Sequence, residues 1–306
     1  MRPPDPSINH NTAWQAHHEG SAEWFIHENN TFARWKMSTG SLLWIHGKRR
    51  ATPFFSSPVE LRPGFTAGSG KTILWCVSVT LSLLKQLTSP ISSSIIQEIT
   101  RIREAGLATT AFFYFDFKDE SKKNSRSALS SLLLQLAAQS DVYSKNLSTL
   151  YSEHDAGSKQ PNEIALKECF RKMLTVPGQG PIYIVIDALD ECPISAGTPS
   201  PREDVLSLVK WLLELRFPRL SVCVTSRPEA DIEAVLQPLV SHSISLHDEI
   251  GKNEDITNYI KWFVNSDPKA RKWRREDKEY VIEKLSERAD GMWASFRFPS
   301  ILTTEW

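Results

Sequence analysis

The sequence IYIVIDALDE, residues 182–191, decides the fold class of this 306-residue chain. Its five consecutive apolar residues are typical of a strand that is buried on both faces, as in a parallel sheet. A carboxylate, Asp187, stands at the end of this run, and α/β sheets bind their ligands at the carboxyl ends of strands. We therefore expect a parallel α/β sheet with a functional site after this strand.

Strand-like and helix-like segments alternate on both sides of this stretch. The segments predicted as strands are 41–47 (SLLWIHG), 109–117 (TTAFFYFDF), 220–225 (LSVCVT) and an edge strand within 240–246. The segments predicted as helices are two short pieces within 21–36, an interrupted stretch over 71–105, and 127–139, 162–174, 205–215 and 230–236. This alternation predicts βαβ units and a mostly parallel sheet with helices on both faces.

A glycine-rich stretch, Ala67-Gly68-Ser69-Gly70-Lys71-Thr72, lies upstream. It matches the end of the phosphate-binding pattern G-x-x-x-x-G-K-[ST]. In such a loop, backbone N–H groups wrap phosphate oxygens, Lys71 binds the β- and γ-phosphates, and the Thr72 hydroxyl is a magnesium ligand. Gly-Ser-Gly-Lys also occurs in ordinary loops. Combined with the parallel sheet, the motif predicts the α/β three-layer fold of P-loop NTPases, flanked by short helical extensions, and a site for ATP or GTP with Mg²⁺.

Two further segments support this prediction. Asp187 is the candidate magnesium ligand opposite the loop, and Asp190 or Glu191 could orient or deprotonate an attacking water. After the strand 220–225, Thr225-Ser226-Arg227-Pro228 places Arg227 where its guanidinium could contact a γ-phosphate. The structural alternatives are a cluster of capping carboxylates after a strand and a surface arginine beside a turn.

The motifs in this order resemble those of the NACHT branch of the STAND NTPases, and in particular the nephrocystin-like NACHT modules of fungi. The matching pieces are residues 20–25 (GSAEWF), LLWIHG, AGSGKT, AFFYFDF, IYIVIDALDEC and VCVTSRPE, within residues 18–265. The resemblance implies a nucleotide-dependent signalling switch with weak hydrolysis that self-associates through this domain, in defence or self-recognition. It also implies that Asp187 holds magnesium, that Asp190 or Glu191 positions water and that Arg227 senses the γ-phosphate.

Two segments depart from the family pattern. The first glycine of the phosphate-binding pattern should stand at position 65, which is Phe65, whereas removing residues 48–65 joins Gly47 to Thr66 and gives a complete match. Gly47 is therefore a candidate phosphate-binding residue, and 48–65 is interpreted as an insertion. A second insertion is expected at about 77–91, and both segments could be retained introns. The alternative function is a nucleotide-binding or inactive interaction fragment, because an interrupted loop can bind phosphate without supporting hydrolysis.

Composition and charge limit the remaining options. Lys plus Arg equals Asp plus Glu at 36 each, so no net charge points to nucleic acid or to a membrane surface. The apolar stretch 73–84 is too short to span a bilayer, and the scattered cysteines predict reduced thiols, so we expect a cytoplasmic protein. The domain interpretation is a lead-in over 1–40, the NACHT domain over 41–250, and a truncated helical lid segment over 251–306.

Overall fold

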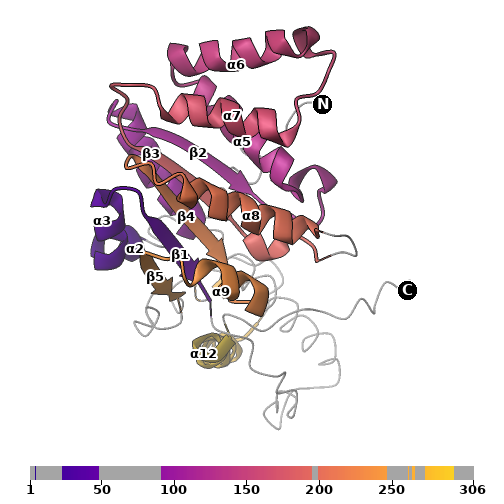
Figure 1. The fold of residues 1–306 in the computed structure, drawn as a ribbon. Helices are drawn as coiled ribbons and strands as arrows, with labels where there is room; N and C mark the ends of the chain where they lie inside the picture. The colour runs from indigo at the N-terminus through magenta and orange to yellow at the C-terminus, as the bar shows by residue number, and fades with distance from the viewer. Residues whose placement is uncertain are drawn as a thin grey trace. The chain divides into compact units, whose positions relative to one another are not determined.

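The computed structural model describes residues 4, 23–47, 91–194, 199–246, 261, 264–265 and 273–292. Contacts divide the chain into one unit of residues 1–46 and 89–244 and a second unit of residues 47–88 and 245–306. The first unit contains the α/β fold (Figure 1). In the second unit, helix α12 spans Arg275–Met292.

The central element is a five-stranded parallel sheet in the order β2-β3-β4-β1-β5. Its strands are β1 (Leu42–His46), β2 (Thr109–Tyr114), β3 (Ile182–Asp187), β4 (Leu220–Ser226) and β5 (His242–Ser245). The register aligns Asp187 with Tyr114 of β2, and Ser226 with His46 of β1. The last residues of β1, β3 and β4 therefore lie along one edge of the sheet.

Helices connect the strands, as parallel pairing requires. They are α2 (Glu23–Glu28), α3 (Asn30–Met37), α5 (Ser125–Ala137), α6 (Asp141–Glu153), α7 (Glu163–Leu174), α8 (Pro201–Glu214) and α9 (Ala230–Leu236). Residues 91–104 form a further helix. Short 3₁₀ turns are η1 (Glu120–Lys122), η2 (Asp155–Gly157) and η3 (Leu189–Glu191).

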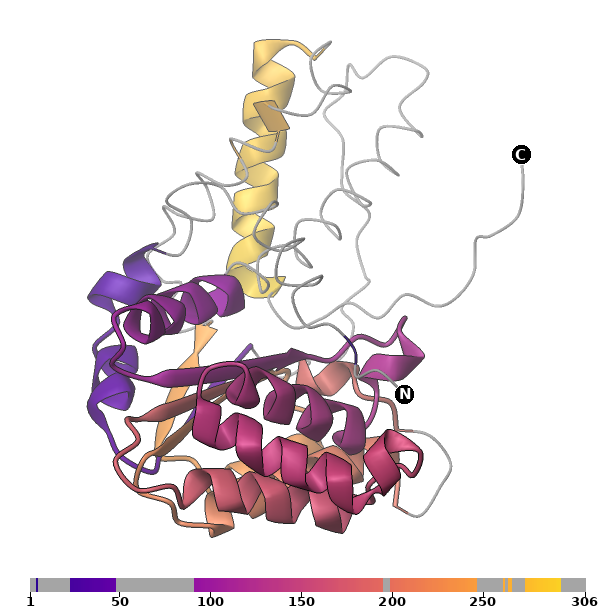
Figure 2. The same cartoon turned by 90° about the horizontal axis from the view of Figure 1, so that it is seen from above.

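Different helices cover the two faces of the sheet. Since successive side chains of a strand point to opposite faces, neighbouring residues of one strand contact different helices. On β3, Ile182, Ile184 and Ile186 join the core cluster that includes buried residues of α5, α7 and α8. Tyr183 instead contacts α3, where its hydroxyl donates to the Lys36 carbonyl (2.7 Å). Asp187, on the same face as Tyr183, contacts the 91–104 helix. Figure 2 shows the resulting three layers, with the 91–104 helix and α5–α8 on opposite sides of the sheet.

Gln135 of α5 and Gln139, two residues after that helix, cover the edge strand β2. The Gln135 side chain accepts a hydrogen bond from Phe112 N (3.0 Å) and donates to Phe112 O (2.7 Å). Gln139 makes the same pair of bonds with Thr110, at 3.0 and 2.6 Å. These amides take the place of a neighbouring strand, which protects the edge from pairing with another chain.

The predicted α/β fold is confirmed, and the predicted strands and helices within the described residues are found within a few residues of their expected limits. The strand predicted over 109–117 ends earlier, at Tyr114. Helix α6 was not predicted, since few of its residues are apolar. The stretch 71–90 and most of the predicted lid lie outside the described residues.

Candidate functional site

The candidate site lies at the carboxyl edge of the sheet, where three motif-bearing strands end. Strand β4 lies between β1 and β3, and it pairs with both. Gly47 follows β1, Asp187 ends β3, and Arg227 follows β4. The structure thus brings the segment before the predicted phosphate loop onto the same sheet edge as two other motifs. Ala67, Gly68, Ser69, Gly70, Lys71 and Thr72 lie outside the described residues.

Asp187 is a buried carboxylate, with 7% of its surface exposed. Its Oδ1 accepts hydrogen bonds from the Ser92 hydroxyl, at the start of the 91–104 helix, and from the Thr225 hydroxyl of β4 (2.5 Å). Burial raises the pKa of Asp187 from its ordinary 3.8 to about 6, although these two hydrogen bonds oppose the rise. Among the described residues no lysine or arginine forms an ion pair with it. Within the part of the chain that the structure describes, the Asp187 carboxylate therefore has no cationic partner.

The chain turns sharply after Asp187. Ala188 adopts the left-handed conformation (φ 54°, ψ 46°), and its N–H donates to Thr225 Oγ1 (3.0 Å). The turn η3 then begins, closed by a hydrogen bond from Glu191 N to Ala188 O (2.9 Å). A non-glycine residue in this conformation is strained, and such strain is common at functional sites. Ala188 therefore forms the turn that presents Asp190 and Glu191.

The Asp190 carboxylate binds Arg227 through both of its oxygens. Its Oδ1 accepts from the backbone N of Arg227 (3.1 Å), and its Oδ2 lies 3.2 Å from Arg227 Nε. Burial raises the pKa of Asp190, and the Arg227 charge opposes that rise. The structure thus brings together two residues that were predicted to act separately. Both carboxylate oxygens of Asp190 are occupied.

Glu191 has fewer partners. Its Oε2 accepts one long hydrogen bond, from Phe117 N (3.4 Å). Burial raises the pKa of Glu191 from 4.5 to about 7, and the neighbouring Asp190 charge adds to the rise. A carboxyl group with a pKa near neutrality can both accept and donate a proton. Of the two carboxylates predicted to position water, Glu191 has the more suitable surroundings.

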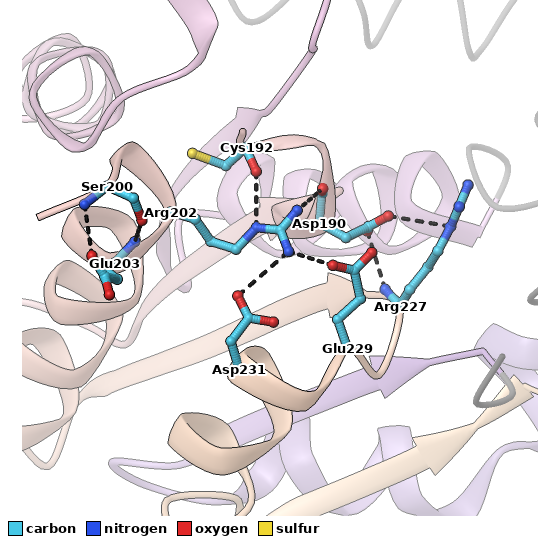
Figure 3. A network of polar contacts seen from close by, with 8 residues as sticks. All are labelled: Asp190, Cys192, Ser200, Arg202, Glu203, Arg227, Glu229 and Asp231. Atoms are coloured by element: carbon cyan, nitrogen blue, oxygen red, sulfur yellow. Dashed lines mark hydrogen bonds and ion pairs between the residues drawn. The ribbon is translucent and has the colours of Figure 1, made fainter. Parts of the chain in front are cut away.

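A second arginine lies behind this pair. Arg202, the second residue of α8, is only 1% exposed. Its guanidinium donates to the carbonyl oxygens of Cys192 (Nε, 2.8 Å) and Asp190 (Nη2, 2.5 Å), and it forms ion pairs with Glu229 and with Asp231 (3.4 Å). Figure 3 shows this arginine between the segment after β3 and the segment after β4.

Sequence reasoning missed Arg202, Thr225 and Ser92 as parts of the site. For Ser92 a signal existed, because removing 77–91 places it shortly after Lys71-Thr72, on the helix expected behind the phosphate loop. Thr225 stood in the segment that contains Arg227 but was given no role of its own, and Arg202 belonged to no motif. Their roles depend on contacts that form only when the strands are paired.

The donor set fits a divalent cation held together with a phosphate ligand. The described residues contain no group of three or more His, Cys, Asp or Glu side chains that could hold a metal ion alone. A single buried carboxylate beside hydroxyl groups is a ligand set of the kind that magnesium uses, with other positions filled by water and substrate phosphates. Asp187, with its raised pKa and its hydroxyl neighbours, meets that description.

Fold and site together define a three-layer α/β domain with a polar edge at the carboxyl ends of its parallel strands. The chain belongs to the family described as Nephrocystin 3, N-terminal, whose family model matches residues 65–227. This match covers more than half of the chain and includes Asp187, Asp190, Glu191 and Arg227. No curated protein matches the chain.

The search for membrane spans gave a negative result within the described residues. None of the helices there combines the length and the apolar character that crossing a bilayer requires.

Proposed function

We propose that this chain binds ATP or GTP together with Mg²⁺ and acts as a signalling switch of the NACHT/STAND type with weak hydrolysis. The observation that carries the proposal is Asp187, a buried carboxylate at the end of β3 with a raised pKa, whose side-chain partners among the described residues are two hydroxyl groups. Burying such a charge is unfavourable unless a cation compensates it. A magnesium ion bound to nucleotide phosphates would supply that cation.

The remaining residues have complementary roles in this proposal. Gly68 to Thr72 would wrap the phosphates, Lys71 would neutralise them, and Thr72 with Asp187 would hold magnesium. Bound magnesium would screen the developing charge on the phosphates. Glu191 would orient or deprotonate the attacking water, and the 39% exposed side chain of Arg227 would contact the γ-phosphate. We also place the protein in the fungal NACHT group, in the cytoplasm, with self-association through this domain.

A second candidate is a nucleotide-binding fragment without turnover. The family match begins at residue 65, although β1 lies upstream and pairs with β4 inside the sheet. This boundary supports an interruption of the phosphate loop between Gly47 and residue 65. In an uninterrupted loop the first glycine would stand at position 65. Binding by Gly68 to Thr72 could survive this interruption while the geometry for hydrolysis is lost.

The test is equilibrium binding of fluorescent ATP and GTP to the purified chain in the presence of Mg²⁺. The proposal predicts saturable binding that weakens at least about tenfold in Lys71→Ala, because a charge-assisted phosphate contact contributes about 1.5–3 kcal/mol. Equal binding by the two proteins would contradict it. Turnover of the full chain and of the chain lacking 48–65 separates the two candidates. The switch model predicts that the full chain hydrolyses nucleotide, whereas the fragment model predicts that hydrolysis requires the deletion.

A further inference from the structure

Arg202 is a buried charge that the proposed nucleotide chemistry does not use. It is fully buried, whereas Arg227 is 39% exposed at the sheet edge. It also lies in the first turn of α8, where the helix dipole disfavours a cation. A buried guanidinium in that position has to be stabilised by specific partners.

The partners of Arg202 come from two different loops. Two of them are carbonyl oxygens of the segment after β3, those of Asp190 and Cys192. The other two are carboxylates of the segment after β4, those of Glu229 and Asp231. The planar guanidinium has enough N–H groups, in fixed directions, to bind all four at once. Arg202 therefore connects the loops that follow two neighbouring strands.

Both loops hold Arg227. From the β3 side, Asp190 accepts from the backbone and the side chain of Arg227. From the β4 side, Glu229 N donates to Arg227 O (2.9 Å), and the Glu229 carboxylate is bonded to Arg202. Figure 3 shows the chain of contacts from Arg202 to Arg227 through Asp190, and the contact of Arg202 with Glu229. Movement of Arg202 would release both contacts.

The start of α8 is itself fixed. Ser200 and Glu203 form a reciprocal capping box, in which Ser200 N donates to the Glu203 carboxylate (2.6 Å) and Glu203 N donates to Ser200 Oγ (3.3 Å). A capping box sets the first turn of a helix. Arg202 is thus anchored on a defined turn and can act as a rigid link.

We propose that Arg202 is a positioning residue that fastens the loop after β3 to the loop after β4 and so holds Arg227 in place to distinguish a nucleoside triphosphate from a diphosphate. The nucleotide part of this inference rests on the proposed function. Arg202 does not contact the ligand. Its effect passes through Asp190, Glu229 and Arg227.

The first test measures the affinities of the full chain for ATP and ADP, and for GTP and GDP, with Mg²⁺. Arg202→Lys keeps the charge but loses the planar fork, and we expect it to lower the triphosphate-to-diphosphate preference about tenfold, as loss of one charge-assisted contact would. Diphosphate affinity should stay within about twofold. Arg227→Ala should lower the preference similarly, and the double variant should lower it no further.

Arg219→Lys is the matched control, because Arg219 also bonds two carbonyl oxygens, those of Gln179 and Val176, at the other end of the sheet. It should leave the preference unchanged. A normal preference in Arg202→Lys, or additive losses in the double variant, would overturn the inference. No saturable binding by the unaltered chain would instead contradict the proposed function.

Amide hydrogen exchange tests the link without nucleotide. We expect Arg202→Lys and the milder Glu229→Gln to raise exchange at least about threefold in both loops, 188–192 and 227–231. A threefold rise in the exchange rate corresponds to a fall of less than 1 kcal/mol in the free energy of local opening. Faster exchange in one loop alone would contradict the coupling, even if the variants fold normally.

Discussion

At the amino end of the sheet, Arg219 donates to the carbonyl oxygens of Gln179 and Val176, whereas at the carboxyl end Arg202 bonds two carbonyl oxygens and two carboxylates. The amino end is also packed closely, since a Cβ at Gly180 would lie 2.9 Å from Leu107 O. The carboxyl end instead holds the buried carboxylate Asp187 and the half-buried carboxylates Asp190 and Glu191. The amino end of the sheet is closely packed, whereas the carboxyl end gathers charged side chains.

This difference separates residues that stabilise the fold from residues kept for a ligand. Among the carboxylates of the carboxyl end, Asp190 is paired with Arg227, whereas Asp187 has only hydroxyl partners among the described residues. An unpaired buried carboxylate lowers the stability of the free protein above its pKa. The comparison therefore predicts that substitutions lower stability at residues that hold the fold together and raise it at a residue kept for a ligand.

The largest effect is expected for Arg202→Met. Removing the guanidinium leaves the carbonyl oxygens of Cys192 and Asp190 without their donor, at about 1–3 kcal/mol each, so the free energy of unfolding should fall by about 3–5 kcal/mol. Chemical denaturation measures it. Lys210→Met, which breaks an exposed ion pair in the same helix, is the control and should change stability by less than about 1 kcal/mol. A loss for Arg202→Met as small as that of the control would contradict the buried network.

Asp187→Asn should stabilise the free protein at high pH. Because the folded pKa of about 6 lies above the ordinary 3.8, the stabilising contribution is fully present below pH 3.8 and is lost as pH rises through 6. The difference corresponds to about 3 kcal/mol. Asparagine keeps an oxygen that can accept from Ser92 and Thr225, so the variant should exceed the wild type by about 2–3 kcal/mol at pH 8.

The measurement is denaturation at pH 4.5 and pH 8, with Glu168→Gln as a control for an exposed carboxylate. The control should keep the wild-type pH dependence. If stability had the same pH dependence in Asp187→Asn and in the wild type, the Asp187 charge would not be destabilising the folded protein.

Gly180→Ala tests the close packing at the amino end. The added methyl group would meet the backbone oxygen of Leu107, which can move only with its chain, so we expect a loss of about 1–3 kcal/mol. Gly178→Ala is no suitable control, because Gly178 has a positive φ of 75°. Undiminished thermal stability of Gly180→Ala would refute the steric argument.

The smallest effect is expected at the carboxyl end, for Ala188→Gly. The left-handed conformation costs an L residue about 1–2 kcal/mol, and the entropy cost of glycine offsets about 0.5–1 kcal/mol, so the variant should gain up to about 1 kcal/mol. Ala188→Val should instead lose stability. Thermal unfolding of the three proteins gives the order, and a valine variant as stable as the glycine variant would contradict it.

Much of the fold was predictable because its signals are local. The apolar run before Asp187 and the alternation of segments predicted the sheet and most of its helices. Helix α6 was missed because only a few of its residues are apolar, although Tyr143, Leu147 and Leu150 recur at helical spacing and pack on the core. Local sequence cannot show stabilisation that comes from neighbouring helices.

The site was predictable where a motif marked it. Asp187, Asp190 and Glu191 were found because they follow a buried strand. The partner of Asp187, Ser92, lies 95 residues away in the sequence, and the pairing of Asp190 with Arg227 depends on β3 and β4 being neighbours. The roles of Gly47 and of Ala67 to Thr72 in phosphate binding stay predictions.

The central claim is that Asp187 is kept for a cation that arrives with a nucleotide. Its most direct test is binding of fluorescent ATP and GTP at pH 5 and pH 7.5, with and without Mg²⁺, to the wild type and to Asp187→Asn. The account predicts Mg²⁺-dependent binding by the wild type that strengthens as pH rises through about 6, and loss of both dependences in the variant. Equal Mg²⁺-dependent binding by the two proteins would contradict it.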